Sequence, residues 1–497
     1  MTKKVLLSAS NSIIEPLALL HLSSIAVEEE WKPKIKLIGE RGFEELIEEV
    51  ECFNPDLLGF TVYTGNHIKI FDWIDKIKKE RPNLLTVIGG PHPTYFPKES
   101  LNHADYVVIS EGFSSFRKIL KGNTQKGILH LSEQESFPSS NREEFYKNHP
   151  THANSPIKSV IARTGCPFKC TYCYNSSTLE SVRDSLSDMQ ISQMEKVVGR
   201  GGRLFPKSSR SVEEILNEVK EIKRCSPETK MIYFQDDIFG EDINWIREFA
   251  KKYPEIGLPF HAQMRFEFAN PQNPKGKERM ELIKKSGGTG ITFAIESAIP
   301  SIRKDVLNRN MREDLMFDVL TFANYLGFNV RTEQMLGLPY GATKEKTEIG
   351  IEADLKTLEL NVRLKQETSL PTIAWASIFA PYRGTPIGNY CRKHGFYERE
   401  NNDVPETFFE RSVLRFPKEW IGPKLQAKNK SFWLEEKEQT KHRDKLQMLR
   451  DLFTNFALIP EGHQLAKTFL ENPDQSYGGL SKLTRHHLYD KVLYKID

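Results

Sequence analysis

The chain has 497 residues, of which 38% are hydrophobic and 28% charged, and a formal net charge of +3 from 70 Lys and Arg against 67 Asp and Glu. This length exceeds one ordinary hydrophobic core and predicts two or three domains. The near balance of charge gives no reason to expect a nucleic acid as the main partner. Six cysteines in so long a chain also exclude the disulfide framework of a small secreted domain.

No segment resembles a membrane span. The most apolar stretch, residues 13–27, is interrupted by Glu15, Pro16 and His21, whereas a span requires an apolar run of about 18–20 residues. The N-terminal residues include two lysines but no apolar core of signal-peptide length. We therefore expect a cytoplasmic protein from a reducing compartment.

Residues 1–131 alternate short apolar runs with segments whose apolar residues recur at helical spacing. The runs predict strands at 5–7, 35–38, 57–62, 85–88 and 106–109, and the helical spacing predicts helices at 14–30, 43–50 and 68–79. Buried strands separated by helices form a parallel sheet that is covered on both faces. The prediction is a doubly wound, Rossmann-like α/β domain that binds its ligand at the carboxyl ends of its strands.

Residues 132–156 are polar and punctuated by prolines, which predicts a linker. A second strand–helix series fills residues 157–395, with strands predicted at 159–163, 231–234, 260–264, 290–295, 329–334 and 373–379. Six such repeats form a partial (β/α)6 barrel, whose chemistry lies at the carboxyl ends of its strands.

Two further signals concern helices. Ser211 and Glu214 form a capping box at the start of an amphipathic segment, which predicts a helix there. Residues 396–497 show no strand signal, and helical patterns at 432–456 and 461–470 predict a helical C-terminal subdomain.

Three of the six cysteines, Cys166, Cys170 and Cys173, lie within eight residues and are spaced CxxxCxxC. Thiolates bind zinc or iron–sulfur iron, and a structural zinc site closes with four protein ligands. Three thiolates on a cubane [4Fe–4S] cluster leave one iron open to an exogenous chelate, as in a catalytic metal site. On residues alone, a zinc site completed by His149 or His152, unligated thiols and an electron-transferring cluster remain alternatives.

With this motif after the first strand of a parallel series, the sequence resembles the radical S-adenosylmethionine (SAM) superfamily over most of its length. The resemblance implies that Cys166, Cys170 and Cys173 hold a [4Fe–4S] cluster whose fourth iron binds SAM. It also implies reductive cleavage of SAM to methionine and a 5'-deoxyadenosyl radical, with electrons from an external reductant such as flavodoxin or ferredoxin.

The resemblance carries over residues for the adenine and for the methionine part of SAM. Tyr172 is expected beside the adenine, and Asp236 or Asp237 near the methionine ammonium, which a carboxylate attracts. Arg265 is expected to pair with the methionine carboxylate. As alternatives, the two aspartates cap a helix and Arg265 forms an exposed salt bridge.

Three later positions complete the expected SAM site. Glu296 follows the fourth strand of the series, where the resemblance implies contact with the ribose hydroxyls. Gly337 and Pro381 follow the fifth and sixth strands, in loops expected around the adenine and the substrate. Glycine and proline that simply shape turns are the alternative.

The N-terminal domain resembles that of the cobalamin-binding subclass, which includes the anaerobic Mg-protoporphyrin ester cyclase and many methyltransferases. The resemblance is carried by three loops, Thr61-Val62-Tyr63-Thr64, Gly89-Gly90-Pro91-His92-Pro93 and Ser110-Glu111-Gly112. Glycines let the backbone approach a large flat ligand, and hydroxyls bond its nucleotide tail. Ordinary turn chemistry is the alternative. The cobalamin-binding residues expected are Asn11, Thr61, Tyr63, Gly89, Gly90, His92, Glu111 and Gly112.

One departure concerns the cobalt ligand. Cobalamin domains of the methionine-synthase kind carry Asp-x-His-x-x-Gly, whereas the corresponding loop here reads Ser10-Asn11-Ser12-Ile13-Ile14-Glu15-Pro16 and contains no His. Many radical members of the subclass also lack this His, so the resemblance implies cobalamin without it. A domain that had lost cobalamin would show the same absence.

The resemblance implies a cobalamin-dependent radical SAM enzyme that transfers a methyl group to an unactivated carbon of a small-molecule substrate. The alternatives are an oxidative cyclase or rearrangement enzyme without methyl transfer, and a non-enzymatic metal- or cobalamin-binding protein. A tRNA methylthiotransferase is excluded, because it needs a second cysteine set in the N-terminal domain, where only Cys52 occurs. No residue is assigned to the chemical step, and no motif names the substrate.

Overall fold

A computed structural model describes residues 2–398, 404–407, 409–422 and 430–471 of the chain. The described residues group into two compact units. The first unit comprises the chain up to Pro167 together with Tyr174–Gln235, and the second comprises Phe168–Cys173 and the described residues from Asp236 onward. The cysteine loop is therefore divided in sequence between the two units.

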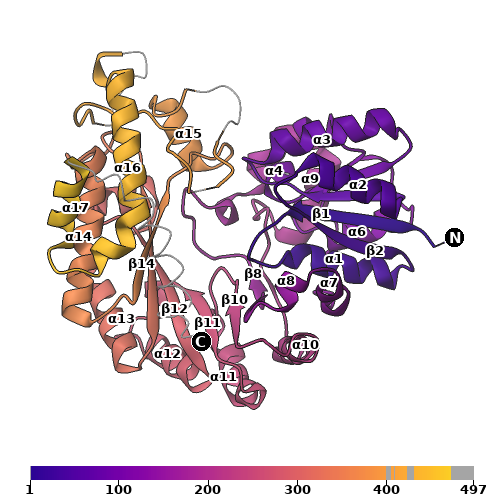
Figure 1. Ribbon diagram of the computed structural model, residues 1–497, viewed down its shortest axis with the longest axis horizontal. Coiled ribbons are helices and arrows are strands. Elements are labelled where there is room, and N and C mark those ends of the chain that lie inside the picture. The colour runs from indigo at the N-terminus through magenta and orange to yellow at the C-terminus, as the bar shows by residue number, and fades with distance from the viewer. Residues whose placement is uncertain (1, 399–403, 408, 423–429, 472–497) are drawn as a thin grey trace. The chain divides into compact units, whose positions relative to one another are not determined.

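The first unit contains the predicted doubly wound sheet (Figure 1). Its six parallel strands lie in the order β2-β1-β3-β4-β5-β6. The strands are β1 (Lys4–Ser10), β2 (Lys32–Ile38), β3 (Leu57–Thr61), β4 (Leu85–Gly89), β5 (Tyr106–Val108) and β6 (Gly127–Leu129). The helices are α1 (Leu17–Glu28), α2 (Phe43–Phe53), α3 (His67–Glu80), α4 (Pro91–Tyr95), α5 (Pro97–Leu101) and α6 (Phe113–Leu120). The sequence did not predict β6, because Gly127 leaves it only two consecutive apolar side chains, Ile128 and Leu129.

Both faces of this sheet are covered, as near-continuous apolar strands require. Val5 and Leu7 of β1 pack in one apolar cluster with residues of α1 and α6, whereas Leu6 packs on the opposite face with residues of α2 and α3. The strand order reverses between β1 and β3, and such a reversal opens a crevice at the carboxyl ends of the two strands. This edge is the expected place for a cofactor.

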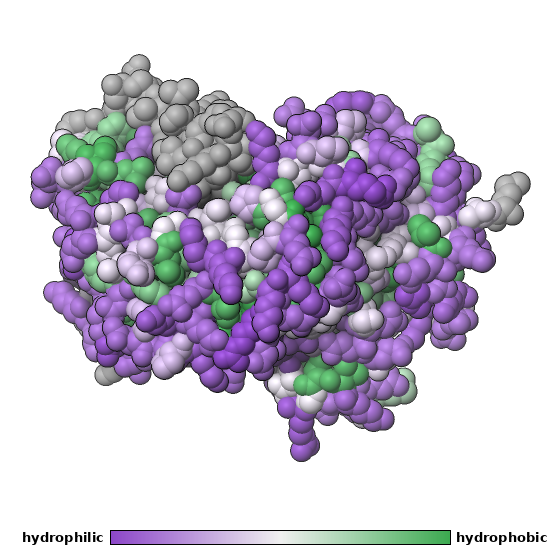
Figure 2. Space-filling view, turned by 90° about the horizontal axis from the view of Figure 1, so that it is seen from below, coloured by the Kyte–Doolittle hydropathy of each residue, from purple (hydrophilic) through white to green (hydrophobic). Residues whose placement is uncertain are grey.

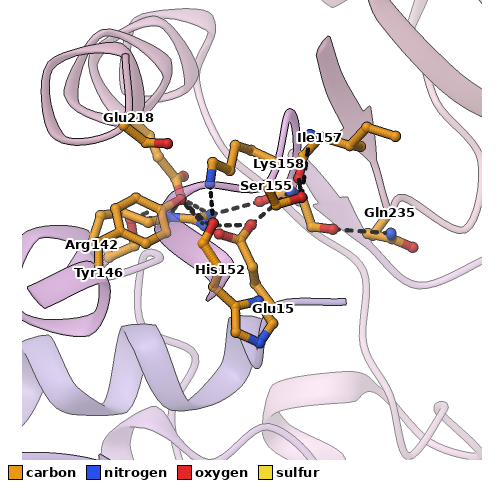
Figure 3. A network of polar contacts seen from close by, with 12 residues as sticks. Glu15, Arg142, Tyr146, His152, Ser155, Ile157, Lys158, Glu218 and Gln235 are labelled. Atoms are coloured by element: carbon orange, nitrogen blue, oxygen red, sulfur yellow. Dashed lines mark hydrogen bonds and ion pairs between the residues drawn. The ribbon is translucent and has the colours of Figure 1, made fainter. Parts of the chain in front are cut away.

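The stretch 132–156 contains two short helices, α7 (Arg142–Asn148) and α8 (Pro150–Ala153). Figure 3 shows the buried polar network that fixes them, with Arg142 at its centre. The guanidinium of Arg142 lies 2.9 Å from Glu15 and 2.7 Å from Glu218, and donates a hydrogen bond of 2.7 Å to the Ser159 carbonyl. The Tyr146 hydroxyl donates to Glu15 at 2.6 Å. Through Arg142, these contacts link Glu15, which precedes α1, to Ser159 and Glu218 of the same unit.

The second strand–helix series forms a parallel sheet in the order β14-β13-β12-β11-β10-β7, which confirms the partial barrel-type fold. The strands are β7 (Ile157–Val160), β10 (Met231–Phe234), β11 (Phe260–Met264), β12 (Gly288–Glu296), β13 (Asn329–Leu336) and β14 (Ile373–Ile378). The helices are α9 (Asp188–Val198), α10 (Val212–Cys225), α11 (Ile243–Lys252), α12 (Pro274–Lys285), α13 (Glu313–Tyr325), α14 (Gly350–Thr368) and α15 (Pro386–Lys393).

Two details of this series test the sequence predictions. The capping box of Ser211 and Glu214 is present at the start of α10. The strand predicted at 159–163 is partly wrong, because β7 ends at Val160. Beyond it, the two-residue strand β8 (Arg163–Thr164) pairs antiparallel with β9 (Ser208–Ser209) instead of extending the parallel sheet.

The C-terminal helical patterns are confirmed as α16 (Glu436–Ala457) and α17 (Gly462–Glu471). Leu449 and Phe453 of α16 pack in one apolar cluster with Leu358 of α14 and Ala374 of β14, and α16 runs beside α14 in Figure 1. This packing places α16 against the end of the second sheet. The predicted subdomain beyond residue 471 lies outside the described residues.

The face shown in Figure 2 is mostly hydrophilic, with hydrophobic side chains in separate patches rather than one continuous band. Exposed apolar residues scattered in this way are ordinary on a folded protein. Of the helices described, none combines the length and the apolar character that crossing a membrane would require.

Candidate active site

The second half of the cysteine loop, Phe168–Cys173, is held by backbone contacts within the second unit. The Thr171 amide donates to the carbonyl of Leu307 at 3.1 Å, and the Thr171 carbonyl accepts from the amide of Ile387 at 3.1 Å. The side chain of Asn308 donates to the Lys169 carbonyl at 2.8 Å. The segment that carries Cys170 and Cys173 is therefore fixed on both sides before any metal binds.

The first half of the loop has its own support, in the first unit. Arg203 donates hydrogen bonds to the carbonyls of Cys166, Pro167 and Asn175, the last two at 2.9 and 2.7 Å. Arg203 is not among the residues predicted for the site, and nothing in the composition of the sequence around it signals this contact. One guanidinium with several donors can bridge three carbonyls in this way.

The donor set of the loop fits an iron–sulfur cluster. Cys170 is buried, and Cys166 and Cys173 are partly buried, and cysteine thiolates are the ligands that hold iron–sulfur clusters. His149 and His152, the side chains considered for a fourth zinc ligand, pack against Phe145 in the described part of the first unit. His149 Nδ1 also lies 3.0 Å from the Phe145 carbonyl. Neither contact supports the zinc alternative.

Tyr172 and Glu296 meet at the carboxyl end of β12. The Tyr172 hydroxyl donates a hydrogen bond of 2.6 Å to Oε1 of Glu296. Arg309, which the sequence did not single out, donates to the Tyr172 hydroxyl at 3.3 Å and lies 3.7 Å from Oε1 of Glu296. Its other terminal nitrogen donates to the Ala294 carbonyl at 2.5 Å. The structure thus joins two predicted SAM residues through a buried arginine.

Burial sets the electrostatics of this group. It raises the pKa of Glu296, although the Arg309 charge and the Tyr172 hydrogen bond act in the opposite direction. Burial also raises the pKa of Tyr172 well above its usual value, which keeps the phenol a hydrogen-bond donor. Glu296 has a positive φ of 70° at a register shift in β12. Such a conformation is unusual for a non-glycine residue and is frequent at functional sites.

Arg265, directly after β11, is buried and points to the cysteine segment. Its Nη1 donates to the Sγ of Cys170 at 3.1 Å, and its guanidinium lies 3.6 Å over the ring of Phe168. Glu267 accepts from Nε at 3.1 Å and from Nη2 at 2.6 Å. An exposed salt bridge, the alternative weighed for Arg265, is therefore wrong, because only 7% of its surface is accessible.

Gly337 follows β13 with a positive φ of 70°. Its amide donates to Oδ1 of Asp354 at 3.0 Å, and the Tyr340 hydroxyl donates to the same oxygen at 2.7 Å. Asp354, on α14, is fully buried, and burial raises the pKa of its carboxyl to about 7. This carboxyl fixes the loop that follows β13. Pro381 lies in the next loop, between β14 and α15.

Asp236 and Asp237 follow β10, and the Asp236 side chain is buried whereas Asp237 is exposed. The alternative that the pair caps a helix is wrong, because the next helix, α11, begins at Ile243 and is capped by Asp242. Neither aspartate caps a helix, so both Asp236 and Asp237 stay predicted partners of the methionine ammonium.

The expected cobalamin loops follow the strands of the first sheet, and two observations fit a large polar ligand. Gly90 has a φ of 104°, and a Cβ there would come within 2.9 Å of the Val62 carbonyl, so only glycine fits this turn. Neither carboxylate oxygen of Glu111, after β5, has a hydrogen-bond partner among the described residues, although both are buried. Burial raises the pKa of Glu111 to about 7.

The remaining residues expected to bind cobalamin differ in their exposure to solvent. Tyr63 is 53% exposed, and Asn11 is also exposed, after β1 at the reversal in strand order. Thr61 and Gly89 end β3 and β4, and Gly112 precedes α6. His92 is different, because its ring is fully buried and stacks on His67 with ring centroids 4.0 Å apart. His92 Nδ1 lies 3.0 Å from the Thr64 hydroxyl, so this side chain supports the loop from inside.

Comparison with known proteins finds two family models that match successive parts of the chain. The family model described as "B12 binding domain" matches residues 3–120, and the model described as "Radical SAM superfamily" matches residues 160–348. The first match contains strands β1–β5 of the first sheet, and the second contains strands β10–β13 of the second strand–helix series. Every residue of the expected cobalamin set lies in the first match, and every expected SAM residue except Pro381 lies in the second.

Similar sequences include methyltransferases. The chain is 22% identical to cytidylyl-2-hydroxyethylphosphonate methyltransferase of Streptomyces wedmorensis, over 77% of this chain and 75% of that protein. It is 24% identical to an uncharacterized methyltransferase of Pyrococcus horikoshii, over 76% of this chain and 78% of that protein. A shorter match, at 22% identity, is to hopanoid C-3 methylase of Methylococcus capsulatus, over 58% of this chain and 54% of that protein.

Among solved structures, the fold is similar to that of the radical SAM methyltransferase TsrM from Kitasatospora setae. The TM-score is 0.55 at 15% identity, over 79% of this chain and 77% of that chain, for the structure with tryptophan and a SAM analogue bound. It is 0.54, over 80% of each chain, for the structure with cobalamin and a [4Fe–4S] cluster bound. With a B12-binding and a radical SAM domain in this order, the cofactors are cobalamin, SAM and a [4Fe–4S] cluster. The chain belongs to the radical SAM superfamily and, within it, to the subclass with an N-terminal cobalamin-binding domain.

Proposed function

We propose that this chain is a cobalamin-dependent radical SAM methyltransferase that methylates an unactivated carbon of a small-molecule substrate. The observation that carries the proposal is the meeting of Cys170, Tyr172 and their buried partners Arg265, Glu296 and Arg309 in a chain that also matches a B12-binding domain. The methyltransferases among its relatives favour methyl transfer over the oxidative cyclase alternative. A non-enzymatic binding protein would have no need of the SAM-contacting residues.

In this proposal, each part of SAM has its own residues. Cys166, Cys170 and Cys173 hold the cluster. Asp236 or Asp237 accepts hydrogen bonds from the methionine ammonium, and Arg265 pairs with the methionine carboxylate. These charged contacts would hold SAM in one orientation at the open iron.

The nucleoside part is bound at the next strands. Glu296 accepts hydrogen bonds from the ribose hydroxyls, and Tyr172 packs beside the adenine while its hydroxyl holds Glu296 in place. Gly337 and Pro381 shape the loops around the adenine and the substrate. Burial of the Glu296 and Arg309 side chains, with Tyr172 partly buried beside them, limits the access of water, which protects reactive species from side reactions.

When bound, the cofactors supply a 5'-deoxyadenosyl radical and a transferable methyl group, and the protein supplies orientation and exclusion of water. On the cobalamin side, Gly89, Gly90 and Gly112 would let the backbone approach the ligand, while Thr61, Glu111 and Asn11 offer polar contacts. Tyr63, with half of its surface exposed, would pack on the corrin. His92 would support the loop of Gly90 from inside.

We further propose that a flavodoxin or ferredoxin supplies the electrons and that the enzyme works in the cytoplasm. The test of the function is product analysis with the reconstituted full-length chain, SAM, a low-potential reductant and candidate substrates, with and without methylcobalamin. The proposal predicts S-adenosylhomocysteine and a methylated product only when cobalamin is present. Formation of 5'-deoxyadenosine and a cyclised product without methylation would favour the cyclase, and absence of all SAM cleavage would contradict both.

A further inference from the structure

The guanidinium of Arg265 occupies an unusual position, because it meets a sulfur that belongs to the expected cluster. Its Nη1 lies 3.1 Å from the Sγ of Cys170. A cysteine thiolate that carries part of the charge of a cluster is a strong hydrogen-bond acceptor for a cationic donor. Hydrogen bonds to cluster sulfurs and the charge around them are among the features that set reduction potentials.

Three contacts make this donor rigid. The Phe168 ring lies 3.6 Å below the guanidinium carbon, and Glu267 accepts two hydrogen bonds, at 3.1 and 2.6 Å. The side chain of Arg265 is 8% exposed and that of Glu267 is 27% exposed. A stacked and doubly bonded guanidinium cannot turn away from the sulfur without breaking its other contacts. The donor is therefore preorganised toward Cys170.

We propose that Arg265 and Glu267 act together as positioning residues that set the reduction potential of the cluster through the Cys170 sulfur. This inference rests on the proposed function, because it requires the cluster to be held by Cys170. Reduction moves one electron from the external low-potential donor to the cluster and forms or breaks no bond to either residue. The added negative charge is stabilised by the Arg265 cation, so the arginine raises the potential, while the Glu267 anion opposes this effect.

The two residues therefore predict shifts of opposite sign. Arg265→Gln removes the cation, which makes the reduced cluster less favourable and the midpoint potential more negative. Glu267→Gln removes the opposing anion and makes the potential more positive. We expect about a tenfold change in the ratio of reduced to oxidised cluster at a fixed potential in each case, which is ~59 mV for a one-electron couple.

The experiment is an anaerobic potentiometric titration of the reconstituted full-length protein, without SAM, followed by the EPR signal of the reduced cluster. Iron content and absorbance are measured first for every variant. Arg265→Lys, which keeps the charge but not the planar fork, is the conservative variant and should shift the potential less than Arg265→Gln.

A matched control is available in the same unit. Arg247 and Glu278 form the same two-bond ion pair, at 2.7 and 2.9 Å, between α11 and α12 at the surface. Arg247→Gln and Glu278→Gln change the net charge equally and should leave the potential unchanged. Opposite shifts at Arg265 and Glu267 support the inference. A loaded cluster whose potential is the same in all these variants, or shifts in one direction for both residues, overturns it, whereas failure of the wild-type chain to assemble any cluster contradicts the proposed function instead.

Discussion

The hydroxyl of Tyr172 donates a hydrogen bond of 2.6 Å to the carboxylate of Glu296, 124 residues further along the chain. This contact links the cysteine segment to the end of β12, and Arg309 contacts both partners. Two residues expected on opposite parts of the SAM nucleoside are thus joined by one hydrogen bond and share the Arg309 side chain. Loss of either member should disturb the other.

Tyr172→Phe tests this link. The buried Glu296 carboxyl would lose its shortest hydrogen bond, and an unsatisfied buried acceptor costs about 1–3 kcal/mol. We expect the dissociation constant for SAM to rise by about tenfold or more, while iron content stays at the wild-type level. Equilibrium binding of SAM to the reconstituted protein measures the effect. Tyr325→Phe, on the highly exposed Tyr325 of α13, is the matched control, and equal SAM affinity in both variants would refute the link.

Arg142→Met tests the buried network of the first unit. The substitution leaves Glu15 and Glu218 buried without their central cation, which should lower the free energy of unfolding by about 3–5 kcal/mol. Urea unfolding followed by circular dichroism measures this loss. Arg224→Met removes a pair of similar length, 2.8 Å from Glu143, whose side chains are 62% and 46% exposed. That control should change stability by less than about 1 kcal/mol.

The same network predicts sensitivity to acid. Burial alone would raise the pKa of Glu218, but the charges of Arg142 and Arg210 outweigh it and hold the pKa well below its usual range. A folded-state pKa below the unfolded value of about 4.5 adds stability above that pH, and this stability is lost as the pH falls. The difference in unfolding midpoint between wild type and Glu218→Gln should therefore shrink on acidification below pH ~4.5. A difference that is constant from pH 7 to pH 3.5 would contradict this assignment.

Asp354→Asn should have the opposite dependence on pH. Burial raises the pKa of Asp354 from 3.8 to about 7, so the folded chain holds this proton more tightly than the unfolded chain. Between about pH 4 and 7 the wild type then loses stability as the pH rises, by at most ~1.4 kcal/mol per pH unit. The asparagine keeps the oxygen that accepts from Gly337 and Tyr340 and does not ionise.

The measurement for Asp354 is thermal unfolding at several pH values. The stability of the variant relative to the wild type should increase as the pH rises to about 7, and the difference should stay constant above that pH. Asp318→Asn on the exposed side of α13 is the matched control. A variant that is equally destabilised at every pH would show that Asp354 does not titrate in this range.

Glu111→Ala tests the cobalamin site. Both carboxylate oxygens of Glu111 are buried without a hydrogen-bond partner among the described residues, and cobalamin carries amide groups that can donate to them. We expect about a tenfold loss of cobalamin affinity, which corresponds to the loss of about one hydrogen bond. Equilibrium dialysis with hydroxocobalamin measures it, and Glu51→Ala on the exposed surface of α2 is the control. Unchanged affinity in Glu111→Ala would remove this residue from the site.

Local patterns made much of this molecule predictable. Apolar runs located β10 and β11 at their observed bounds, and the Ser211 capping box marked the start of α10. The cysteine spacing is equally local. The prediction of a linker at residues 132–156 overlooked α7. The apolar pair Phe145 and Tyr146 is too short to indicate a helix, and a charged residue such as Arg142 is expected at the surface unless its ion-pair partners are known.

Contacts between distant residues were not predictable. Arg309 meets Tyr172 across 137 residues, and Arg142 meets Glu15 across 127. Neither arginine belongs to a motif, since a buried ion pair leaves no periodicity in the sequence. Glu267 is likewise unremarkable in sequence, although its two hydrogen bonds hold Arg265 at the Cys170 sulfur. The sequence thus indicated which strands carry the site but not the charged residues that support it.

The central claim is that Cys166, Cys170 and Cys173 hold a [4Fe–4S] cluster with one iron open to SAM. The most direct test is the EPR spectrum of the anaerobically reconstituted and reduced protein, recorded with and without SAM, beside Cys170→Ala and the control Cys225→Ala on α10. The account predicts a cluster signal in the wild type and in the control that changes when SAM is added, and no such signal in Cys170→Ala. An iron-free wild-type protein, or a cluster signal that SAM leaves unchanged, would contradict it.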